Sequence, residues 1–201
     1  EEADILVGTQ MIVKGHDFPK VTLVGALAAD MSLYTDDYRS GERTFQLLTQ
    51  AAGRAGRGDR PGEVVIQTYD PEHYAIEASA AQDYEAFYEK EIRYRSLMGY
   101  PPVENLMAVL AACEDEALLE KACKYLKEYI LRIKGQAQLD VIGPASPGVD
   151  KIKDIYRRVI YVKAPEYRTL VVLKDRMEQY IEINSGFQKM RIQFDFNPMN
   201  L

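Results

Sequence analysis

The segment Gly99-Tyr100-Pro101-Pro102 constrains the fold of this chain more than any other feature. Proline has no backbone donor and pushes the residue before it toward extended geometry, so a helix cannot continue through two consecutive prolines. The helical patterning of residues 71–98 is therefore expected to end here. We place a domain boundary at this segment and expect a separate part of the chain on each side of it.

The part before the boundary has the pattern of half an α/β sheet. Apolar or β-branched runs at residues 4–8, 21–27 and 62–68 are bounded by turn signals, as in buried parallel strands. Apolar residues at helical spacing predict a helix over residues 40–55, with Ser40 as its N-cap. Because the sheet is incomplete and the chain starts directly in a strand without a methionine, we expect a piece of a larger protein.

The part after the boundary reads in the order β-α-β-β-α-β. This order is typical of a split βαβ sandwich, in which two helices cover one face of a four-stranded sheet. The predicted fold class is thus α/β before the boundary and α+β after it. Strands are expected at residues 106–112, 139–142, 157–163 and 190–196, and helices at residues 116–134 and 166–183.

Composition excludes several classes of protein. The 201 residues are 47% hydrophobic and 28% charged, which is typical of a globular protein. No run is long enough to cross a bilayer, and the amino terminus has no secretory signal, so we expect a cytoplasmic protein without a membrane partner. Cys113 and Cys123 are expected to be reduced core residues, and two cysteines with two distant histidines predict no metal site.

Charge is distributed unevenly along the chain. The net charge is −6, but residues 1–98 carry −7, residues 99–201 carry +1, and the stretch 121–176 carries +7. Binding to nucleic acid depends on local cationic patches that neutralise phosphates, so the basic stretch is a candidate binding surface. The alternative is that these cations form the solvated faces of two helices.

One segment within this stretch has an especially high density of cations. Residues 151–158 carry four cations and a tyrosine, directly after a loop rich in glycine and proline, which suits contact with a single strand or a fork. The alternative is an edge strand whose charges prevent aggregation. The candidate DNA-binding residues are Lys151, Lys153, Tyr156, Arg157 and Arg158.

Two motifs before the boundary indicate nucleotide chemistry. Residues 8–17 read G-T-Q-x-x-x-K-G-x-D after a predicted strand, where α/β proteins place ligands. Residues 50–58 read QAAGRAGRG at the end of the predicted helix, so Arg54 and Arg57 would project from one helical face and present positive charge to a γ-phosphate. The alternative for these arginines is a helix terminus closed by Gly58. In order and spacing, the two motifs match the last two motifs of superfamily 2 helicases.

Within that superfamily, the chain resembles the primosomal protein N′ family of replication-restart DNA helicases. The resemblance rests on the K-G-H-D-F-P wording of residues 14–19, the connector at residues 34–43, QAAGRAGRG and the Tyr-Pro-Pro boundary, and it covers nearly the whole chain. It implies that residues 1–75 are the carboxyl part of a RecA-like second helicase lobe and residues 76–100 a helical connector. Residues 101–201 would be a C-terminal DNA-binding domain with a ribosomal-protein-like fold.

The resemblance also implies an activity. A family member is an ATP-dependent 3′-to-5′ DNA helicase that recognises stalled or branched replication forks and initiates primosome assembly, in the cytoplasm at the nucleoid. The implied partners are branched and single-stranded DNA, primosome proteins and single-stranded-DNA-binding protein. The alternative function is an isolated DNA-binding or protein-binding adaptor without catalytic activity.

The resemblance further assigns residues to the nucleotide and the DNA. Arg57 would be the arginine finger, Arg54 would pair with the phosphates, and Gln50 would relay the nucleotide state. Asp17 and Gly15 would lie beside the nucleotide. The residues expected to face the DNA backbone are Gly8, Thr9 and Lys14.

The expected cofactors are bound mainly elsewhere in the family's proteins. ATP with Mg²⁺ belongs mainly to a first lobe, whose phosphate-loop and D-E-x-H motifs do not occur in this sequence, so the chain alone is expected to be inactive. Zinc belongs to a cysteine-rich module that lies upstream of the motifs seen here.

Overall fold

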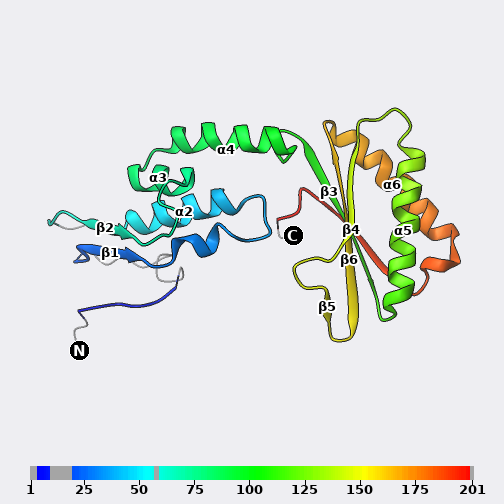
Figure 1. The fold of residues 1–201 in the computed structure, drawn as a ribbon, viewed down its shortest axis with the longest axis horizontal. Helices are drawn as coiled ribbons and strands as arrows, with labels where there is room; N and C mark the ends of the chain where they lie inside the picture. The colour runs from blue at the N-terminus through cyan, green and yellow to red at the C-terminus, as the bar shows by residue number, and fades with distance from the viewer. Residues whose placement is uncertain (1–3, 10–19, 57–58, 200–201) are drawn as a thin grey trace. The chain divides into compact units, whose positions relative to one another are not determined.

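The computed structural model describes residues 4–9, 20–56 and 59–199, which form a mixed α/β structure with five α-helices and two sheets (Figure 1). The chain divides into two compact units, Glu1–Arg93 and Tyr94–Leu201. No helix within the described residues is long and apolar enough to cross a membrane.

The first unit is built around a pair of parallel strands. Strands β1 (Leu23–Ala26) and β2 (Glu63–Ile66) pair in parallel, with the 3-10 helix η1 (Ala29–Ser32) and helix α2 (Ser40–Ala52) between them in the chain. Helices α3 (Tyr74–Ala81) and α4 (Tyr84–Met98) follow. Two of the three predicted strands and the predicted helix are thus confirmed.

Two predictions for this unit are wrong in detail. No strand forms over residues 4–9, where Ile5 and Val7 are more than 80% exposed. A strand exists through hydrogen bonds to a neighbour, and within the described residues β1 and β2 pair with each other alone. Ser40 is the first residue of α2, not its cap, because Arg39 occupies the cap position and makes no side-chain capping bond.

The core of the first unit joins α2 to α3 and α4. Phe45 is buried and stacks on Phe87, with 4.3 Å between ring centroids. The hydroxyl of Tyr74 donates to a carboxylate oxygen of the buried Glu91 at 2.6 Å. A Cβ at Gly41 would lie 2.7 Å from the Tyr74 hydroxyl oxygen, so α2 approaches this hydrogen bond through a glycine.

Asp30 fastens η1 to the chain after β2. Its buried carboxylate accepts hydrogen bonds from the Thr68 hydroxyl at 2.5 Å and from the backbone N–H of Tyr69 at 2.9 Å. The Thr68 bond is the largest cause of a lowered pKa for Asp30, followed by the bond from Tyr69. The ionised form of Asp30 therefore holds this part of the unit together.

The second unit is an antiparallel sheet with two helices on one face (Figure 1). The strand order is β4-β6-β3-β7, and a short strand, β5, pairs with the start of β6. The elements are β3 (Asn105–Cys113), α5 (Glu116–Ile133), β4 (Asp140–Ala145), β5 (Lys151–Ile152), β6 (Ile155–Ala164), α6 (Tyr167–Ile183), η2 (Ser185–Phe187) and β7 (Arg191–Phe196).

The predicted element order of this unit is found, but its sheet has five strands where four were predicted. Lys153 and Asp154 both have positive φ, 48° and 64°, and form the tight turn that joins β5 to β6. The sequence did not reveal this hairpin because such turns favour Asn and Gly, whereas Lys is an unusual choice. β6 therefore begins two residues earlier than expected.

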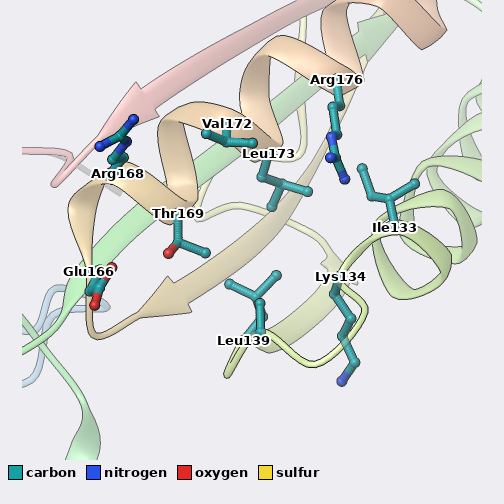
Figure 2. A pocket seen from close by; sticks show the side chains of 10 residues that line it. Ile133, Lys134, Leu139, Glu166, Arg168, Thr169, Val172, Leu173 and Arg176 are labelled. Carbon is teal, nitrogen blue, oxygen red and sulfur yellow. The ribbon is translucent and has the colours of Figure 1, made fainter.

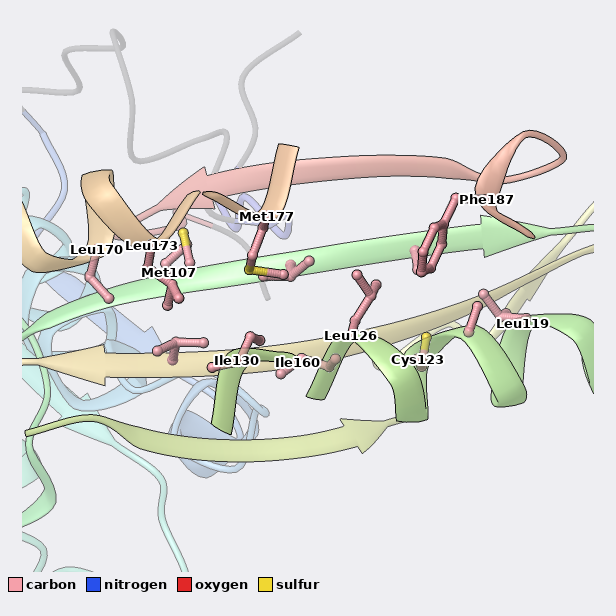
Figure 3. Close-up of a cluster of buried hydrophobic side chains, with 14 of the residues drawn as sticks. Met107, Leu119, Cys123, Leu126, Ile130, Ile160, Leu170, Leu173, Met177 and Phe187 are labelled. Atoms are coloured by element: carbon pink, nitrogen blue, oxygen red, sulfur yellow. The ribbon is translucent and has the colours of Figure 1, made fainter. Parts of the chain in front are cut away.

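Alternation along the strands separates two faces of the sheet. On the face toward the helices, Leu126 and Ile130 of α5 and Met177 of α6 pack on Met107 and Ile160 of the strands (Figure 3). Cys113 and Cys123 belong to this core as free thiols, which confirms their prediction. Burial raises the pKa of the Cys123 thiol to about 11, so this thiol stays protonated near neutral pH.

The Gly-Tyr-Pro-Pro segment ends α4 at Met98, as predicted. Arg95 donates to the Pro101 carbonyl at 3.0 Å. The buried ammonium of Lys163 donates to the Met98 carbonyl at 2.7 Å and lies 3.9 Å from the centroid of the Tyr100 ring. Side chains of the second unit therefore fix the conformation of this segment.

Candidate functional site

The turn that follows α2 contains the second sequence motif. The helix ends at Ala52, and the N–H of Gly53 donates to the Thr49 carbonyl at 3.0 Å. Gly56 has φ +69°, and its N–H donates to the Val21 carbonyl at 3.0 Å. A Cβ at Gly56 would lie 2.5 Å from the Gly62 nitrogen. Glycine is therefore needed at position 56 both for the left-handed backbone and for close packing against the segments that lead into β1 and β2.

The structure places some of the residues predicted from this motif. Gln50 is exposed in the last turn of α2, and the half-buried Arg54 lies in the turn beyond the helix. The prediction of a helix to residue 55 is therefore wrong, because the helix stops at Ala52 and Arg54 lies beyond it. Arg57 lies outside the described residues.

The first motif is described in part. Gly8 and Thr9 are exposed in a segment without regular structure. Lys14, Gly15 and Asp17 lie outside the described residues.

The second unit carries the basic hairpin, which we define as residues 151–158. Lys151 pairs with Asp154 at 2.9 Å, and its ammonium lies 4.7 Å from the centroid of the Tyr156 ring. The hydrogen bond to Asp154 is the largest cause of a raised pKa for Lys151. Lys153 lies exposed in the turn, and Arg157 donates from Nη1 to the Val149 carbonyl at 3.2 Å. The structure thus places Lys151, Lys153, Tyr156 and Arg157 on one hairpin, but Tyr156 packs against the core under the helices, whereas Arg157 points to the other face of the sheet.

Arg158 does not share the environment of these residues. Its guanidinium pairs with Glu116 at 2.9 Å and Glu120 at 2.5 Å, both on α5, and its side chain is 11% exposed. The hydrogen bond to Glu120 is the largest cause of a raised pKa for Arg158. Because adjacent strand residues point to opposite faces, Arg158 points toward the helices while Arg157 points away from them. Two carboxylates already balance its charge, which does not favour the predicted contact with DNA.

A groove that sequence reasoning missed lies between the end of α5 and α6 (Figure 2). It has a volume of about 300 Å³. Its floor includes Leu139 and Leu173. Three cations and one carboxylate also line it: Lys134 follows α5, Arg168 and Arg176 lie on α6, and Glu166 is the N-cap residue of α6. Arg176 extends toward Ile133 in Figure 2. The two arginines are eight residues apart, but the sequence could not show that Lys134 would join them.

The part of the chain that the structure describes contains no group of three or more His, Cys, Asp or Glu residues that could hold a metal ion. His73 is the N-cap of α3, where its Nδ1 accepts from the N–H of Ala75 at 3.2 Å.

Comparison with known proteins gives consistent matches. The family described as "Primosomal protein N C-terminal domain" matches residues 96–199. A protein of Bacillus subtilis named "Replication restart protein PriA" is 41% identical over 98% of this chain and 24% of its own length. Proteins of the same name from Synechocystis and Haemophilus influenzae are 39% and 34% identical over 100% of this chain, and over 23% and 27% of their own lengths. The chain thus spans about a quarter of the length of these relatives.

Proposed function

The chain belongs to the primosomal protein N C-terminal domain family, and on that premise we propose that it is the C-terminal part of a replication restart helicase. In this proposal the complete protein is an ATP-dependent 3′-to-5′ DNA helicase that recognises stalled or branched forks and initiates primosome assembly. The observation that carries the proposal is 41% identity over 98% of the chain to a protein named for replication restart.

We assign the first unit to the carboxyl part of a RecA-like second helicase lobe. The parallel pairing of β1 with β2, with α2 between them in the chain, supports this assignment. We assign the second unit to a split βαβ domain that resembles a ribosomal protein, and its strand order supports that assignment.

The turn after α2 has the donor types that a polyphosphate requires. Arg54 lies two residues after the end of α2, Gln50 is exposed in the last turn of the helix, and the crowded Gly56 fixes the backbone just after Arg54. Guanidinium groups suit phosphate because they donate several hydrogen bonds from a permanently charged plane. ATP hydrolysis would supply the free energy for movement along DNA, with Mg²⁺ and most of the nucleotide held by the first lobe.

Each motif residue has a proposed role. Arg54 holds the phosphates, Gln50 responds to them, and Arg57 stabilises the charge that develops in the transition state. Asp17 and Gly15 hold the nucleotide. The remaining motif residues, Gly8, Thr9 and Lys14, contact the DNA backbone. Zinc in the complete protein is proposed to lie outside this chain.

The enzymatic part of the proposal is tested with Arg57→Ala in the complete protein. We expect DNA-stimulated ATP turnover to fall by about 10³-fold or more, since arginine fingers are worth roughly 10³–10⁵ in rate. Nucleotide binding, measured by equilibrium titration, should change little. Arg60→Ala is the matched control, because Arg60 is an exposed cation three residues further along. Near-normal turnover in the Arg57 variant would refute the assigned role.

The proposed partners are branched and single-stranded DNA, primosome proteins and single-stranded-DNA-binding protein. The basic hairpin is the proposed contact for DNA, because Lys153 is exposed in its turn and Arg157 points away from the helices, where both cations can pair with phosphates. The groove of Figure 2 is the proposed contact for an acidic, apolar segment of a protein partner. Its apolar floor and its excess of cations, Lys134, Arg168 and Arg176 against the one carboxylate of Glu166, support this choice.

A further inference from the structure

The sheet of the second unit has a second face, on which neither α5 nor α6 packs (Figure 1). Strand register places three rows of side chains across this face from β6 over β3 to β7. The rows are Arg157, Ala112 and Arg191; Val159, Leu110 and Gln193; and Tyr161, Ala108 and Asp195. We call this surface the open face.

Two arginines lie at one end of the open face. Arg157 and Arg191 are the cross-strand partners of Ala112 on its two sides. Neighbouring strands are about 4.8 Å apart, so the two Cα atoms lie about 10 Å from each other. Ala112 has a small side chain, which leaves the space between the two guanidiniums free of a larger central residue. Within the described residues of this unit, the ion pairs with carboxylates involve Lys151, Arg158 and Lys174, and neither of these two arginines.

An apolar pocket adjoins the arginine pair. It has a volume of about 220 Å³ and is lined by Ala108, Leu110, Val159 and Tyr161 of the sheet and by Pro198. Ala108 and Val159 are each only 1% exposed, so Leu110 and Tyr161 are the sheet residues accessible in it. The segment Pro147–Val149 forms one wall, and the Val149 carbonyl holds Arg157 in place. This volume is smaller than the roughly 300–1,000 Å³ of pockets that enclose whole drug-sized ligands, and it suits a single planar ring.

The two ends of the open face carry opposite charges. The arginine pair lies in the first row, whereas the carboxylate of Asp195 lies in the third row beside Ala108. A phosphate is therefore attracted to the arginine end and repelled from the other end. The cations of the basic hairpin continue from the arginine end, because β5 and its turn lead directly into Arg157.

We propose that the open face binds one unpaired nucleotide of a DNA strand. Its backbone phosphate lies between Arg157 and Arg191, and its base lies in the pocket against Leu110 and Tyr161. A paired base cannot enter, because its faces are covered by its neighbours and its edge by its partner. This inference rests on the proposed DNA-binding function and adds a surface that accepts an unpaired base, for which Arg191 and Tyr161 are the determining residues.

Photocrosslinking tests where the base lies. The probe is a thymine-rich single-stranded oligonucleotide with one 5-iododeoxyuridine, irradiated with the full chain and mapped by peptide mass spectrometry. We expect an adduct on Tyr161 that disappears in Tyr161→Leu, which keeps a smaller apolar side chain at this position of the strand. Circular dichroism would verify that the variant is folded. Adducts confined to the basic hairpin would overturn the inference while the proposed DNA binding stands.

Salt titration tests the phosphate contact. Arg191→Gln should lower the log–log slope of single-strand affinity against salt by about 0.7, the value for one phosphate contact on a single strand. Arg132→Gln is the matched control, because Arg132 is an exposed cation on α5, which packs on the opposite face of the sheet. Tyr161→Leu should weaken binding by about tenfold, since stacking on one aromatic side chain is worth that order of affinity.

The outcomes separate the two proposals. An unchanged slope in Arg191→Gln together with unchanged affinity in Tyr161→Leu would overturn the open-face site, even if the chain binds DNA through the basic hairpin. A chain that binds no oligonucleotide would overturn both the site and the proposed DNA-binding function.

Discussion

The turn after α2 and the basic hairpin both place cations beside the end of a regular element, but they are held in different ways. In the turn, backbone hydrogen bonds and close packing at Gly56 set the geometry. In the hairpin, strand pairing sets which side chain faces which way, so neighbouring Arg157 and Arg158 have different partners. A short motif can therefore identify the turn. For the hairpin, the register of the whole sheet is needed to tell which cations point away from the helices and their carboxylates.

The largest expected effect comes from a substitution in the turn after α2. Gly56→Ala adds a Cβ to a residue at φ +69° and 2.5 Å from the Gly62 nitrogen, so we expect the first unit to lose about 2–3 kcal/mol of unfolding free energy. Urea unfolding followed by circular dichroism measures this loss.

Gly53→Ala is the control from the same motif. Gly53 has φ −66°, and the nearest atom, the Thr49 carbonyl oxygen, would lie 3.5 Å from an added Cβ. Its unfolding free energy should stay within about 1 kcal/mol of the parent, since alanine fits this conformation. Equal losses in the two variants would contradict a specific requirement for glycine at position 56.

The second prediction separates the neighbouring arginines of the hairpin. Arg158→Ala should lower the unfolding free energy of the second unit by about 1 kcal/mol, because Glu116 and Glu120 lose a shared partner at a partly exposed site. Its affinity for DNA should change little. Arg157→Ala should do the opposite, with weaker DNA binding and nearly unchanged stability. If both variants weaken DNA binding equally, the assignment of Arg158 to α5 alone is wrong.

The third and smallest expected effect is on the pH dependence of the stability of the first unit. The folded pKa of Asp30 is lowered, mainly by the Thr68 hydroxyl, so Asp30 contributes stability that is present above its unfolded pKa near 3.8. This contribution is lost as the pH falls through the lower, folded pKa. Asp30→Asn should therefore unfold with a smaller loss of stability between pH 7 and pH 3 than the parent chain. If the unfolding free energies of the variant and the parent chain fall equally between pH 7 and pH 3, Asp30 has no such role.

The sequence predicted those elements whose pattern is set locally. The helices at residues 116–134 and 166–183 were located within one residue, because a full apolar face repeats along each of them. The run at residues 4–8 has an equally apolar pattern but forms no strand, since a strand depends on a neighbour that the pattern does not specify. The hairpin at Lys153 and Asp154 was missed because its turn residues are unusual.

The candidate sites also differ in whether a local sequence pattern or the pairing of distant strands determines them. The motif after α2 could be seen in the sequence, but its helix ends three residues earlier than predicted, and the roles of its arginines stay a prediction. The opposite orientations of Arg157 and Arg158 required the register of β6, and the pairing of Arg191 beside Ala112 required that of β7. The groove beside Arg168 joins residues from two helices, which no local pattern reveals.

Binding of fluorescent forked DNA to the full chain tests the central claim, that this chain contacts replication-fork DNA through its basic hairpin. Lys153→Ala combined with Arg157→Ala should weaken binding and flatten the log–log salt slope by about two, one for each phosphate contact. Lys124→Ala with Arg132→Ala removes the same charge from exposed positions of α5 and should leave the slope unchanged. Affinity and slope that stay the same in the hairpin variant, or fall equally in the α5 control, would contradict the claim.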